Sequence, residues 1–520
     1  MTTPTSTPVG TPAPQPAPGT EITGTDAPPV ESAPSEGWLA ANRGPLAVEL
    51  SSATKSVRLT SAAGGVFTVT GVEEAKALFA HAAATDRKLW AADAAMQEKL
   101  HREFFAELGC PRIWCARTVD RVLAPEKDKG ELPSGQALAA IVQAYNAAPR
   151  VERQHAFWVE DEDRIWRSVA RRGFLIDEQL LTIERQARHR ELADFVRNHG
   201  VDVRRADATK ESWLTSLGVK FARSDEYGYT WPTKCDVTDM PAEHAETWAA
   251  YKSAHSALKR VQLLDGVNKK IEGDGRVRPI IKTNSAASGR MAVTSPGMQG
   301  HPAELRGVFL AEPGHDVISF DHSNAELRVL ARLIGDPAFT ERVMTGDPYS
   351  ELAAFTGRTR SEEKWRLLAW SYGLGITTLT KNVGAEQAEA TFAGCQALFP
   401  EIAAWGKEQT ARTVRGERLT TLTGRPLPNL GERASRPGLA TNLLTQGSAR
   451  DAWGIGVRRA AALLGESAMF FPLHDELFVL SPRGKAEETS ELLRQVMTVD
   501  LGQDVILTGT AKVQRGRWGK

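Results

Sequence analysis

Apolar residues in the first part of the chain occur in short runs separated by turn residues, which is the pattern of strands. Stretches with helical spacing of apolar residues follow these runs. In order, the predicted elements are strands at 46–50, 56–59 and 65–69, helices at 72–84 and 93–108, a strand at 112–115 and a helix near 136–147. The first three strands suit a meander, and the whole set predicts a compact α/β domain of about 110 residues.

A long helical region is expected to begin near Glu160 and to be interrupted at Gly173. Its apolar face is formed by Ile165, Val169, Ile176, Leu180, Leu181 and Ile183. Further helices are expected at 185–198 and 240–270, and strands alternate with helices over 300–520. The pattern predicts a multidomain α/β protein without an internal repeat.

Composition narrows the class of protein. A chain of 520 residues with 41% hydrophobic and 25% charged residues has room for two or three globular domains. No apolar run approaches the roughly 20 residues of a membrane helix, and no secretory leader is visible, so we expect no membrane association. The cysteines are too few and too scattered for a disulfide framework or a zinc site: Cys110, Cys115, Cys235 and Cys395. A reducing cytoplasm fits these features best.

Residues 1–40 differ from the rest of the chain. The first 36 residues hold nine of the 28 prolines and cannot bury enough apolar surface to fold, so we expect residues 1–40 to be disordered. Such a segment is either a flexible tether or padding without function, and padding is favoured. With 64 basic and 64 acidic residues the net charge is zero, so any nucleic-acid site must be a local basic groove.

One candidate catalytic carboxylate lies between a strand and a helix. The segment Asp316-Val-Ile-Ser-Phe-Asp321 reads as a buried strand that ends in an acid, and apolar residues at helical spacing follow it. Glu326 falls in the first turn of that helix. An Asp in this position is more often a helix cap than a functional group, so Asp321 alone does not establish a site.

Two further acids are expected at a hairpin turn. Apolar runs flank the tripeptide His474-Asp475-Glu476, which predicts two strands with the acids at a cleft, the alternative being a solvated turn. If these strands neighbour the one that ends at Asp321, the carboxylates converge. Such carboxylates can hold two Mg²⁺ ions about 3.5–4 Å apart for an in-line phosphoryl displacement.

A third candidate element is a helix over 360–373. Arg360, Lys364, Leu368 and Tyr372 are four residues apart and form one ridge on it. The two cations could hold a triphosphate, and the apolar and aromatic residues a base. Alone, the ridge is better explained as an amphipathic helix with solvated ends.

Together these elements resemble the polymerase region of family A DNA polymerases, the class of bacterial DNA polymerase I and many phage replicases, over about 161–520. Asp321-His-Ser-Asn-Ala-Glu-Leu-Arg328 is similar to the first palm motif, Asp-Tyr-Ser-Gln-Ile-Glu-Leu-Arg, and His474-Asp475-Glu476 to the last. The fingers-helix spacing is kept at 360–373. Further matches, in the family's order, are the thumb entry at 167–177, Gly289-Arg290-Met291, Pro296-Gly-Met-Gln299-Gly-His-Pro302, and Asn442 with Gln446-Gly447.

The resemblance implies a role for each matched residue. Asp321 and Asp475 would bind two Mg²⁺ ions, which Mn²⁺ could replace, with Glu476 assisting. Glu326 would exclude a 2′-hydroxyl from the sugar pocket, and Lys364 would protonate the leaving pyrophosphate. The implied contacts to the incoming dNTP are Glu326, Arg360, Lys364, Leu368 and Tyr372, and those to DNA are Arg290, Gln299, Asn442, Gln446 and His474.

Several residues depart from the family pattern. Leu368 stands in place of Phe or Tyr, which weakens base stacking on the fingers helix. His322 and Ala325 replace Tyr and Ile, and we expect them to enlarge the pocket near Glu326. These changes bear on nucleotide selectivity rather than on activity.

The resemblance also implies a fold: a right hand of palm, fingers and thumb behind a small, degenerate RNase H-like exonuclease domain. The implied ranges are 1–40 for the tail, 41–155 for the exonuclease-like domain and 156–520 for the polymerase, with the thumb near 160–275, the palm near 276–345 and 420–520, and the fingers near 346–420.

The metal ligands of the exonuclease-like domain look incomplete. Glu49 and Ser51 stand where its first strand should carry Asp-x-Glu, and Asp93 and Gln97 where Asn and Asp are expected. Tyr145 lacks the following Asp of a Tyr-x-x-x-Asp pair. We therefore expect no 3′–5′ proofreading. The alternative is a divergent active site with ligands among Asp86, Asp93, Glu98 and Asp120.

The sequence thus predicts template-directed 5′–3′ DNA synthesis from dNTPs on a primer–template, by a monomer in the cytoplasm of a bacterium or a phage-infected cell. A processivity partner is not identified. A single-subunit RNA polymerase is the first alternative, and Glu326 argues against it. A catalytically inactive nucleic-acid clamp is the second, and retention of Asp321 and Asp475 argues against it. A phage polymerase that favours 2-aminoadenine is a narrower variant, suggested by Ala325.

Overall fold

The structure is a computed structural model of the chain. It describes residues 34–41, 45–51, 56–61, 65–70, 72–84, 89–91, 96, 100, 113–123, 135–205, 208–218, 223–224, 228–229 and 242–519. Helix α1 (Pro34–Ala41) falls in one unit, residues 1–43, and the other described elements in a second, residues 44–520. The segment 1–40, expected to be disordered, therefore ends in a helix. Pro34 suits the first helical turn, and the run Trp38–Ala41 tolerates helix well.

The N-terminal part of the second unit is a five-stranded sheet with strand order β3-β2-β1-β4-β5. The first three strands form the predicted antiparallel meander, whereas β4 is parallel to β1 and β5 to β4. The elements are β1 (Leu46–Ser51), β2 (Ser56–Ser61), β3 (Val66–Thr70), α2 (Val72–Ala84), β4 (Leu89–Ala91), β5 (Ile113–Cys115), α4 (Ala116–Leu123) and α5 (Gly135–Ala147). The predicted helix at 93–108 lies almost entirely outside the described residues.

Aromatic side chains cover one face of this sheet. Ala47, Trp90 and Trp114 are direct neighbours across β1, β4 and β5. The two indole rings are 5.0 Å apart, and Tyr145 of α5 packs on both, at 5.5 and 5.2 Å. Because side chains alternate along a strand, Glu49 stands on the same face as Ala47. The aromatic group therefore lies beside Glu49.

Helix α6 (Arg150–Arg172) connects this sheet to the rest of the second unit. It begins ten residues before the expected start at Glu160, because its first half packs in a different core: Ala156 and Val159 belong to the N-terminal core. Its second half, with Ile165 and Trp166, packs in the central core. The boundary expected at 155/156 thus falls inside a continuous helix and not in a linker.

Gly173 ends α6 with a left-handed backbone (φ 73°), and the chain continues as strand β6 (Phe174–Ile176). Ile176 is therefore in a strand, not on the expected helical face. A Cβ at Gly173 would lie 2.8 Å from the carbonyl oxygen of Val277, so the close pairing of β6 with β9 requires glycine.

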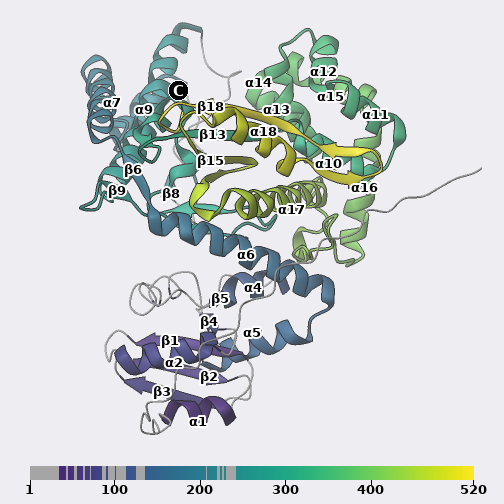
Figure 1. Ribbon diagram of the computed structural model, residues 1–520. Coiled ribbons are helices and arrows are strands. Elements are labelled where there is room, and N and C mark those ends of the chain that lie inside the picture. Colours follow the sequence, from purple (N-terminus) through teal and green to yellow (C-terminus); the bar gives the residue numbers. More distant parts are fainter. Residues whose placement is uncertain are drawn as a thin grey trace, which may run out of the picture. The chain divides into compact units, whose positions relative to one another are not determined.

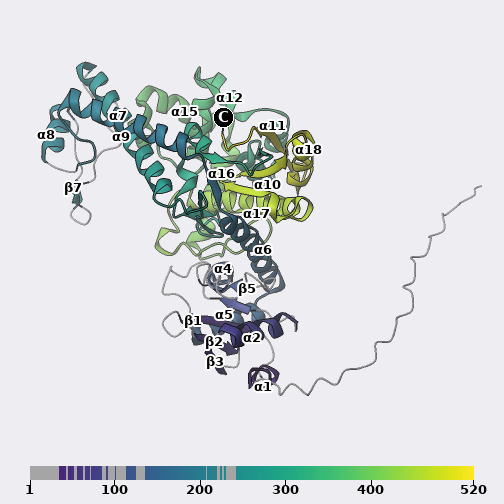
Figure 2. The same ribbon diagram turned by 60° about the vertical axis from the view of Figure 1, so that its left-hand side comes forward.

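The predicted helices at 185–198 and 240–270 correspond to α7 and α9, which lie side by side (Figure 2). The elements that follow β6 are α7 (Glu178–His199), α8 (Ala208–Ser216), β7 (Arg223–Ser224), β8 (Gly228–Tyr229), α9 (Ala245–Asn268), β9 (Arg276–Val277), β10 (Ile280–Lys282), β11 (Ala292–Thr294) and β12 (Phe309–Leu310).

An antiparallel sheet with strand order β14-β15-β13-β18 forms the centre of the C-terminal region (Figure 1). One helix, α18, packs against three of its strands and is followed by a short hairpin, and α17 shares the core of the sheet. The elements are β13 (His315–His322), α10 (Ala325–Ile334), α17 (Leu439–Leu464), β14 (Met469–Leu473), β15 (Glu476–Pro482), α18 (Ala486–Met497), β16 (Val499–Gly502), β17 (Val505–Leu507) and β18 (Gly509–Gln514).

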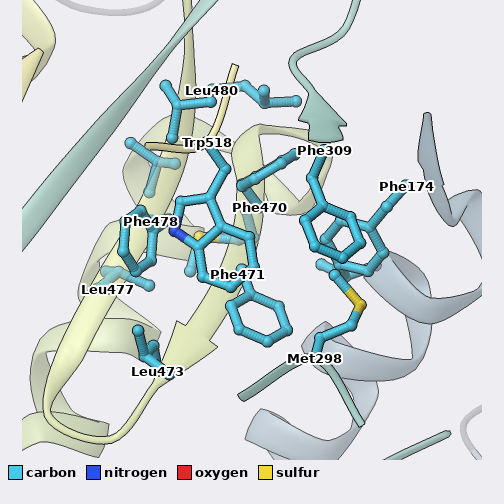
Figure 3. Packing of buried hydrophobic residues seen from close by; sticks show 14 of the residues in the cluster. Phe174, Met298, Phe309, Phe470, Phe471, Leu473, Leu477, Phe478, Leu480 and Trp518 are labelled. Carbon is cyan, nitrogen blue, oxygen red and sulfur yellow. The ribbon is translucent and has the colours of Figure 1, made fainter. Parts of the chain in front are cut away.

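The core beneath this sheet is rich in aromatic residues and is closed by the C-terminal segment (Figure 3). Trp518 is fully buried, and its ring lies 4.7 Å from Phe471, 5.3 Å from Phe309 and 5.5 Å from Phe478. Phe320 of β13 belongs to the same core. The strand that leads to Asp321 is therefore anchored by packing along most of its length.

Six helices between α10 and α17 form a cluster (green in Figure 1), whose core also includes Leu327, Leu330 and Ala331 of α10. They are α11 (Pro337–Thr345), α12 (Pro348–Thr356), α13 (Arg360–Ser371), α14 (Ile376–Val383), α15 (Ala385–Leu398) and α16 (Pro400–Val414). A capping box starts α13: Thr359 and Glu362 each accept a hydrogen bond from the other's backbone N–H. Within the described ranges, no helix has the length and hydrophobicity needed to cross a membrane.

Candidate active site

Two adjacent strands bring three carboxylates to one end of the central sheet. Asp321 of β13 lies directly opposite Glu476, the first residue of β15. Asp475 precedes Glu476 in the turn after β14, where His474 adopts a left-handed backbone (φ 53°) that permits a tight reversal. The condition under which the carboxylates were expected to converge, that these strands are neighbours, is met. The turn itself is only His474-Asp475, because Glu476 already belongs to the strand ladder.

The carboxylates repel one another. Asp321 remains open to solvent, yet burial by the surrounding protein and the charge of Asp475 raise its pKa, which Lys364 and Lys512 partly offset. Burial and the charge of Asp321 likewise raise the pKa of Glu476. Negative charges held this close together favour binding of a cation between them.

Arg290 bridges two of the acids. Its Nη2 donates to Glu326 Oε1 at 2.9 Å, and to Asp475 Oδ1 and Oδ2 at 3.2 and 3.0 Å. Burial opposes the charged form, but the carboxylates of Asp475 and Glu326 raise the pKa of Arg290 above its ordinary value. The arginine that the resemblance assigns to DNA thus neutralises two carboxylates of the site.

Glu326 and Tyr372 meet in the same region. Glu326 lies in the first turn of α10, as expected, and Tyr372 directly follows α13. Burial, and then the nearby Glu326 carboxylate, raise the pKa of Tyr372 well above its ordinary value. By contrast, His322 is buried with its Nε2 2.8 Å from the Met497 carbonyl oxygen, and Ala325 packs in a core cluster. These two side chains are engaged elsewhere and do not provide the enlarged pocket expected of them.

The predicted ridge on α13 divides into two parts. Arg360 and Lys364 are exposed, and their charged groups lie 5.3 and 5.9 Å from the ring centroid of Tyr349. Arg360 also pairs with Asp347, donating from Nε at 2.5 Å and from Nη2 at 3.2 Å. Leu368, expected to contact the incoming nucleotide, is partly buried and packs against the core of the helical cluster. The two cations are thus the exposed part of the ridge, and Leu368 and Tyr372 the partly buried part.

The residues expected to contact DNA differ in the exposure of their side chains and in their contacts within the protein. Gln299 accepts from the Val293 N–H at 3.1 Å and donates to the Pro472 carbonyl at 3.5 Å, so it braces the strand before the turn. Asn442 and Gln446 are partly exposed and lie one turn apart on α17, which is otherwise largely buried. His474 is exposed at the turn beside Asp475.

Three residues near the site were not predicted from the sequence. Asp347 and Tyr349 engage the cations of α13, and Lys512 of β18 influences both Asp321 and Glu476. The pair Asp347-Pro348 is typical of a helix N-terminus, so the sequence gives no sign that Asp347 pairs with Arg360. Lys512 could have been found only by pairing the last strand with the strand of Asp321.

The donor set fits Mg²⁺ that arrives with a phosphate substrate. Among the described residues, no three His, Cys, Asp or Glu side chains form a ready-made metal cage. However, Asp321 and Asp475 are hard oxygen donors on neighbouring elements, and Arg290 already binds Asp475 as a cation would. Mg²⁺ is commonly held by one or two carboxylates together with substrate phosphates.

Comparisons with known proteins point to one family. The family model for DNA polymerase family A matches residues 223–520. DNA polymerase I of Mycobacterium tuberculosis is 25% identical over 313 residues, which cover 54% of this chain and 34% of that protein. The DNA polymerase of Mycobacterium phage D29 is 25% identical over 408 residues, covering 74% of this chain and 65% of that protein. The chain thus spans about a third of the length of the mycobacterial DNA polymerase I.

A solved structure extends the similarity of the fold. The POL domain of Pol1 from M. smegmatis, in complex with DNA primer-template and dNTP, matches with a TM-score of 0.75 at 17% sequence identity. The match covers 94% of this chain and 98% of that one. It therefore includes the N-terminal sheet as well as the central one.

Proposed function

The chain belongs to DNA polymerase family A, and from this membership we propose that it carries out template-directed 5′–3′ DNA synthesis from dNTPs on a primer 3′-hydroxyl. The observation that carries the proposal is the placement of Asp321 opposite Glu476, with Asp475 adjacent in the turn. A non-catalytic scaffold has no use for three carboxylates gathered at one end of a sheet, where burial and neighbouring negative charge raise the pKa of Asp321 and Glu476.

The architecture supports a right-hand assignment. We assign the palm to the sheet β14-β15-β13-β18 with α10, α17 and α18, the fingers to the cluster α11–α16, and the thumb to α7, α8 and α9. In this assignment the metal-binding acids lie in the palm, and the cations of α13 reach them from the fingers. The effect of Lys364 on the pKa of Asp321 supports that proximity.

The chemistry is nucleotidyl transfer. Mg²⁺ bound by Asp321 and Asp475 would stabilise the charge that develops on the attacking and leaving oxygens. Lys364 and Arg360 would hold the triphosphate, and Lys364 would give a proton to the departing pyrophosphate. Arg360 must then give up its ion pair with Asp347 to bind phosphate oxygens. Glu476 adds negative charge beside the metal site.

The sugar and the bases would be held by the groups around Glu326. Its carboxylate, fixed by Arg290 and close to Tyr372, would occupy the space that a 2′-hydroxyl needs. A cavity of about 410 Å³ lined by Trp370, Gly373 and mostly apolar neighbours adjoins Tyr372 and offers room for a template base. We propose that Asn442, Gln446 and His474 contact DNA directly, because their side chains remain accessible, and that Gln299 supports the turn.

The N-terminal sheet is proposed to be a degenerate exonuclease-like domain. Its order and strand directions, an antiparallel meander followed by two parallel strands, support an RNase H-like fold. Trp90, Trp114 and Tyr145 pack beside Glu49, where a metal site would need carboxylates. Asp86, Asp93, Gln97 and Glu98 lie outside the described residues.

Glu326 and Ala325 bear on the alternatives to a DNA polymerase that uses ordinary dNTPs. A single-subunit RNA polymerase needs room for a 2′-hydroxyl, and the fixed position of Glu326 argues against that. A preference for 2-aminoadenine rested on Ala325, whose burial in a core cluster gives it no contact with a base. An inactive clamp would bind DNA without extending it.

A primer-extension assay tests the proposed function. A labelled primer on a defined template is incubated with Mg²⁺ and each dNTP or rNTP in turn. We expect templated addition of the complementary dNTP and much slower addition of the rNTP. Binding of the primer–template without any extension would favour the clamp, and equal use of rNTPs would favour an RNA polymerase.

A second assay tests proofreading. A primer with a 3′ mismatch is incubated with the enzyme and Mg²⁺ in the absence of nucleotides. Without a complete set of carboxylates we expect no shortening. Steady shortening that is lost in Asp93→Ala or Asp120→Ala would show an active exonuclease site.

A further inference from the structure

Helix α6 carries a run of four acids, Glu160-Asp161-Glu162-Asp163, which by composition alone belongs on a solvated surface. Three of them are buried instead: Glu160 is 1% exposed, Glu162 0% and Asp163 1%. Burial of a carboxylate is costly unless it is paired and hydrogen-bonded. The partners of these acids therefore indicate what the run is for.

Glu162 pairs with Arg450 of α17. The guanidinium donates from Nη2 to Oε2 at 2.7 Å and from Nη1 to Oε1 at 3.1 Å, which is a bidentate arrangement. Arg458 adds a contact to Oε1 at 3.3 Å. Gly454 permits the approach, because a Cβ there would lie 2.3 Å from Glu162 Oε1. The pair fixes the orientation of the Arg450 guanidinium.

Arg450 also holds the loop that leads to Arg290. Its Nε donates to the carbonyl oxygen of Gly289 at 2.9 Å. Arg425 donates from Nη2 to the preceding carbonyl, that of Ser288, at 2.8 Å. Gly289 has φ 87°, and a Cβ there would lie 2.8 Å from Arg425, so the loop is clamped tightly. The backbone is thus held directly before the residue that bridges the site carboxylates.

We propose that Glu162 is a positioning residue for the active site. It orients Arg450, which holds the Gly289 carbonyl, so that Arg290 reaches both site carboxylates at once. This inference rests on the proposed function, because it assigns Glu162 an effect on nucleotide transfer. A displacement of about 1 Å in a positioned group can lower a rate roughly a hundredfold.

The chain offers a matched control on the same helix. Glu160 is equally buried and also paired, accepting from the Cys115 N–H at 3.0 Å and from Arg167 Nη2 at 3.1 Å. These two partners belong to β5 and to α6 itself, not to the loop before Arg290. Loss of the Glu160 charge therefore shows how the loss of a buried, paired carboxylate on α6 affects the stability of the protein.

The experiment compares Glu162→Gln with Glu160→Gln and wild type by single-turnover primer extension, below the unfolding temperature of each variant. For Glu162→Gln we expect the single-turnover rate constant to fall roughly ten- to a hundredfold and the preference for dNTP over rNTP to change, with primer–template affinity retained. For Glu160→Gln we expect the rate constant and the preference for dNTP over rNTP to stay near wild type, even if the unfolding temperature falls.

Arg450→Lys is the second variant and decides the outcome if Glu162→Gln does not fold. Lysine keeps a positive charge for Glu162 but lacks the separate Nε–H donor to Gly289. We expect a folded protein with the same kinetic defect. Wild-type kinetics in Arg450→Lys, or equal effects of Glu162→Gln and Glu160→Gln, would overturn the inference. Failure of the wild-type protein to extend primers would instead count against the proposed function.

Discussion

The guanidinium of Arg290 donates to both carboxylate oxygens of Asp475, at 3.2 and 3.0 Å, although the two residues are 185 positions apart. The same nitrogen lies 2.9 Å from Glu326. One arginine therefore supplies the positive charge that a proposed metal ligand and a proposed sugar-pocket residue share. A metal ion that binds Asp475 must compete with this arginine.

Substitution of Arg290 should change metal affinity and activity in opposite directions. In Arg290→Met the competing cation is absent, so we expect Mn²⁺ or Mg²⁺ to bind the DNA-free enzyme several-fold more tightly by calorimetric titration. Extension should nevertheless fall, because Glu326 loses its partner. Arg328→Met is the control, since Arg328 bonds the Ile506 carbonyl and Thr508 and not the site acids. Unchanged metal affinity in Arg290→Met would contradict the competition.

Removal of the Glu326 side chain should weaken discrimination against ribonucleotides. We expect Glu326→Ala to lower the ratio of kcat/KM for dNTP over rNTP by about tenfold or more, because the blocking group is gone. Glu326→Gln retains the bulk and should keep most of the discrimination. If the alanine variant keeps the wild-type ratio, Glu326 does not exclude the 2′-hydroxyl.

Acid should destabilise the protein partly through His301. Burial lowers the pKa of His301 to about 4 from its ordinary value of 6.5, so between these pH values the folded state keeps the imidazole neutral while the unfolded state binds a proton. Stability is therefore lost as pH falls from about 6.5 towards 4, by up to about 3 kcal/mol. His301→Phe keeps the packing of a ring on Phe309. We expect its Tm to fall less than that of wild type between pH 8 and pH 5, and an identical decrease would exclude His301.

Truncation of Trp518 should destabilise the fold strongly. Its indole is fully buried among three phenylalanines, so Trp518→Ala should cost about 3–5 kcal/mol, seen as a lower Tm in thermal unfolding. Trp365 is 42% exposed on α13, and Trp365→Ala should change stability by only about 0.5 kcal/mol. Similar Tm values for the two variants would show that the C-terminal segment does not close the core.

Elements set by local patterns could be predicted from the sequence. The apolar run before Asp321 and the two runs around His474 are neighbouring strands, because each run is buried almost continuously and a short turn joins two of them. Glu326 likewise lies in the first turn of α10, as the spacing of the apolar residues predicts. The strands themselves, the hairpin turn and the helix start depend on residues that are close in sequence, whereas the pairing of β13 with β15 joins distant segments.

Partners from distant segments could not be predicted. The acidic run 160–163 gives no sign of burial, since the arginine that pairs with Glu162 is 288 residues away. The packing of Leu368 against the core of the helical cluster could not be predicted either, because the spacing of a ridge does not show which neighbouring helices it meets. The early start of α6 was missed because its two halves pack in different cores.

Primer extension by Asp321→Asn and Asp475→Asn tests the two-metal site most directly. Asparagine keeps the shape but removes the charge, so metal ligation should fail while phosphate contacts elsewhere keep duplex affinity. Asp336→Asn, which alters a helix cap outside the site, is the control. We predict no measurable extension by either site variant, with primer–template binding by fluorescence anisotropy near wild type. Retention of more than a few per cent of the wild-type rate in both variants would contradict the assignment.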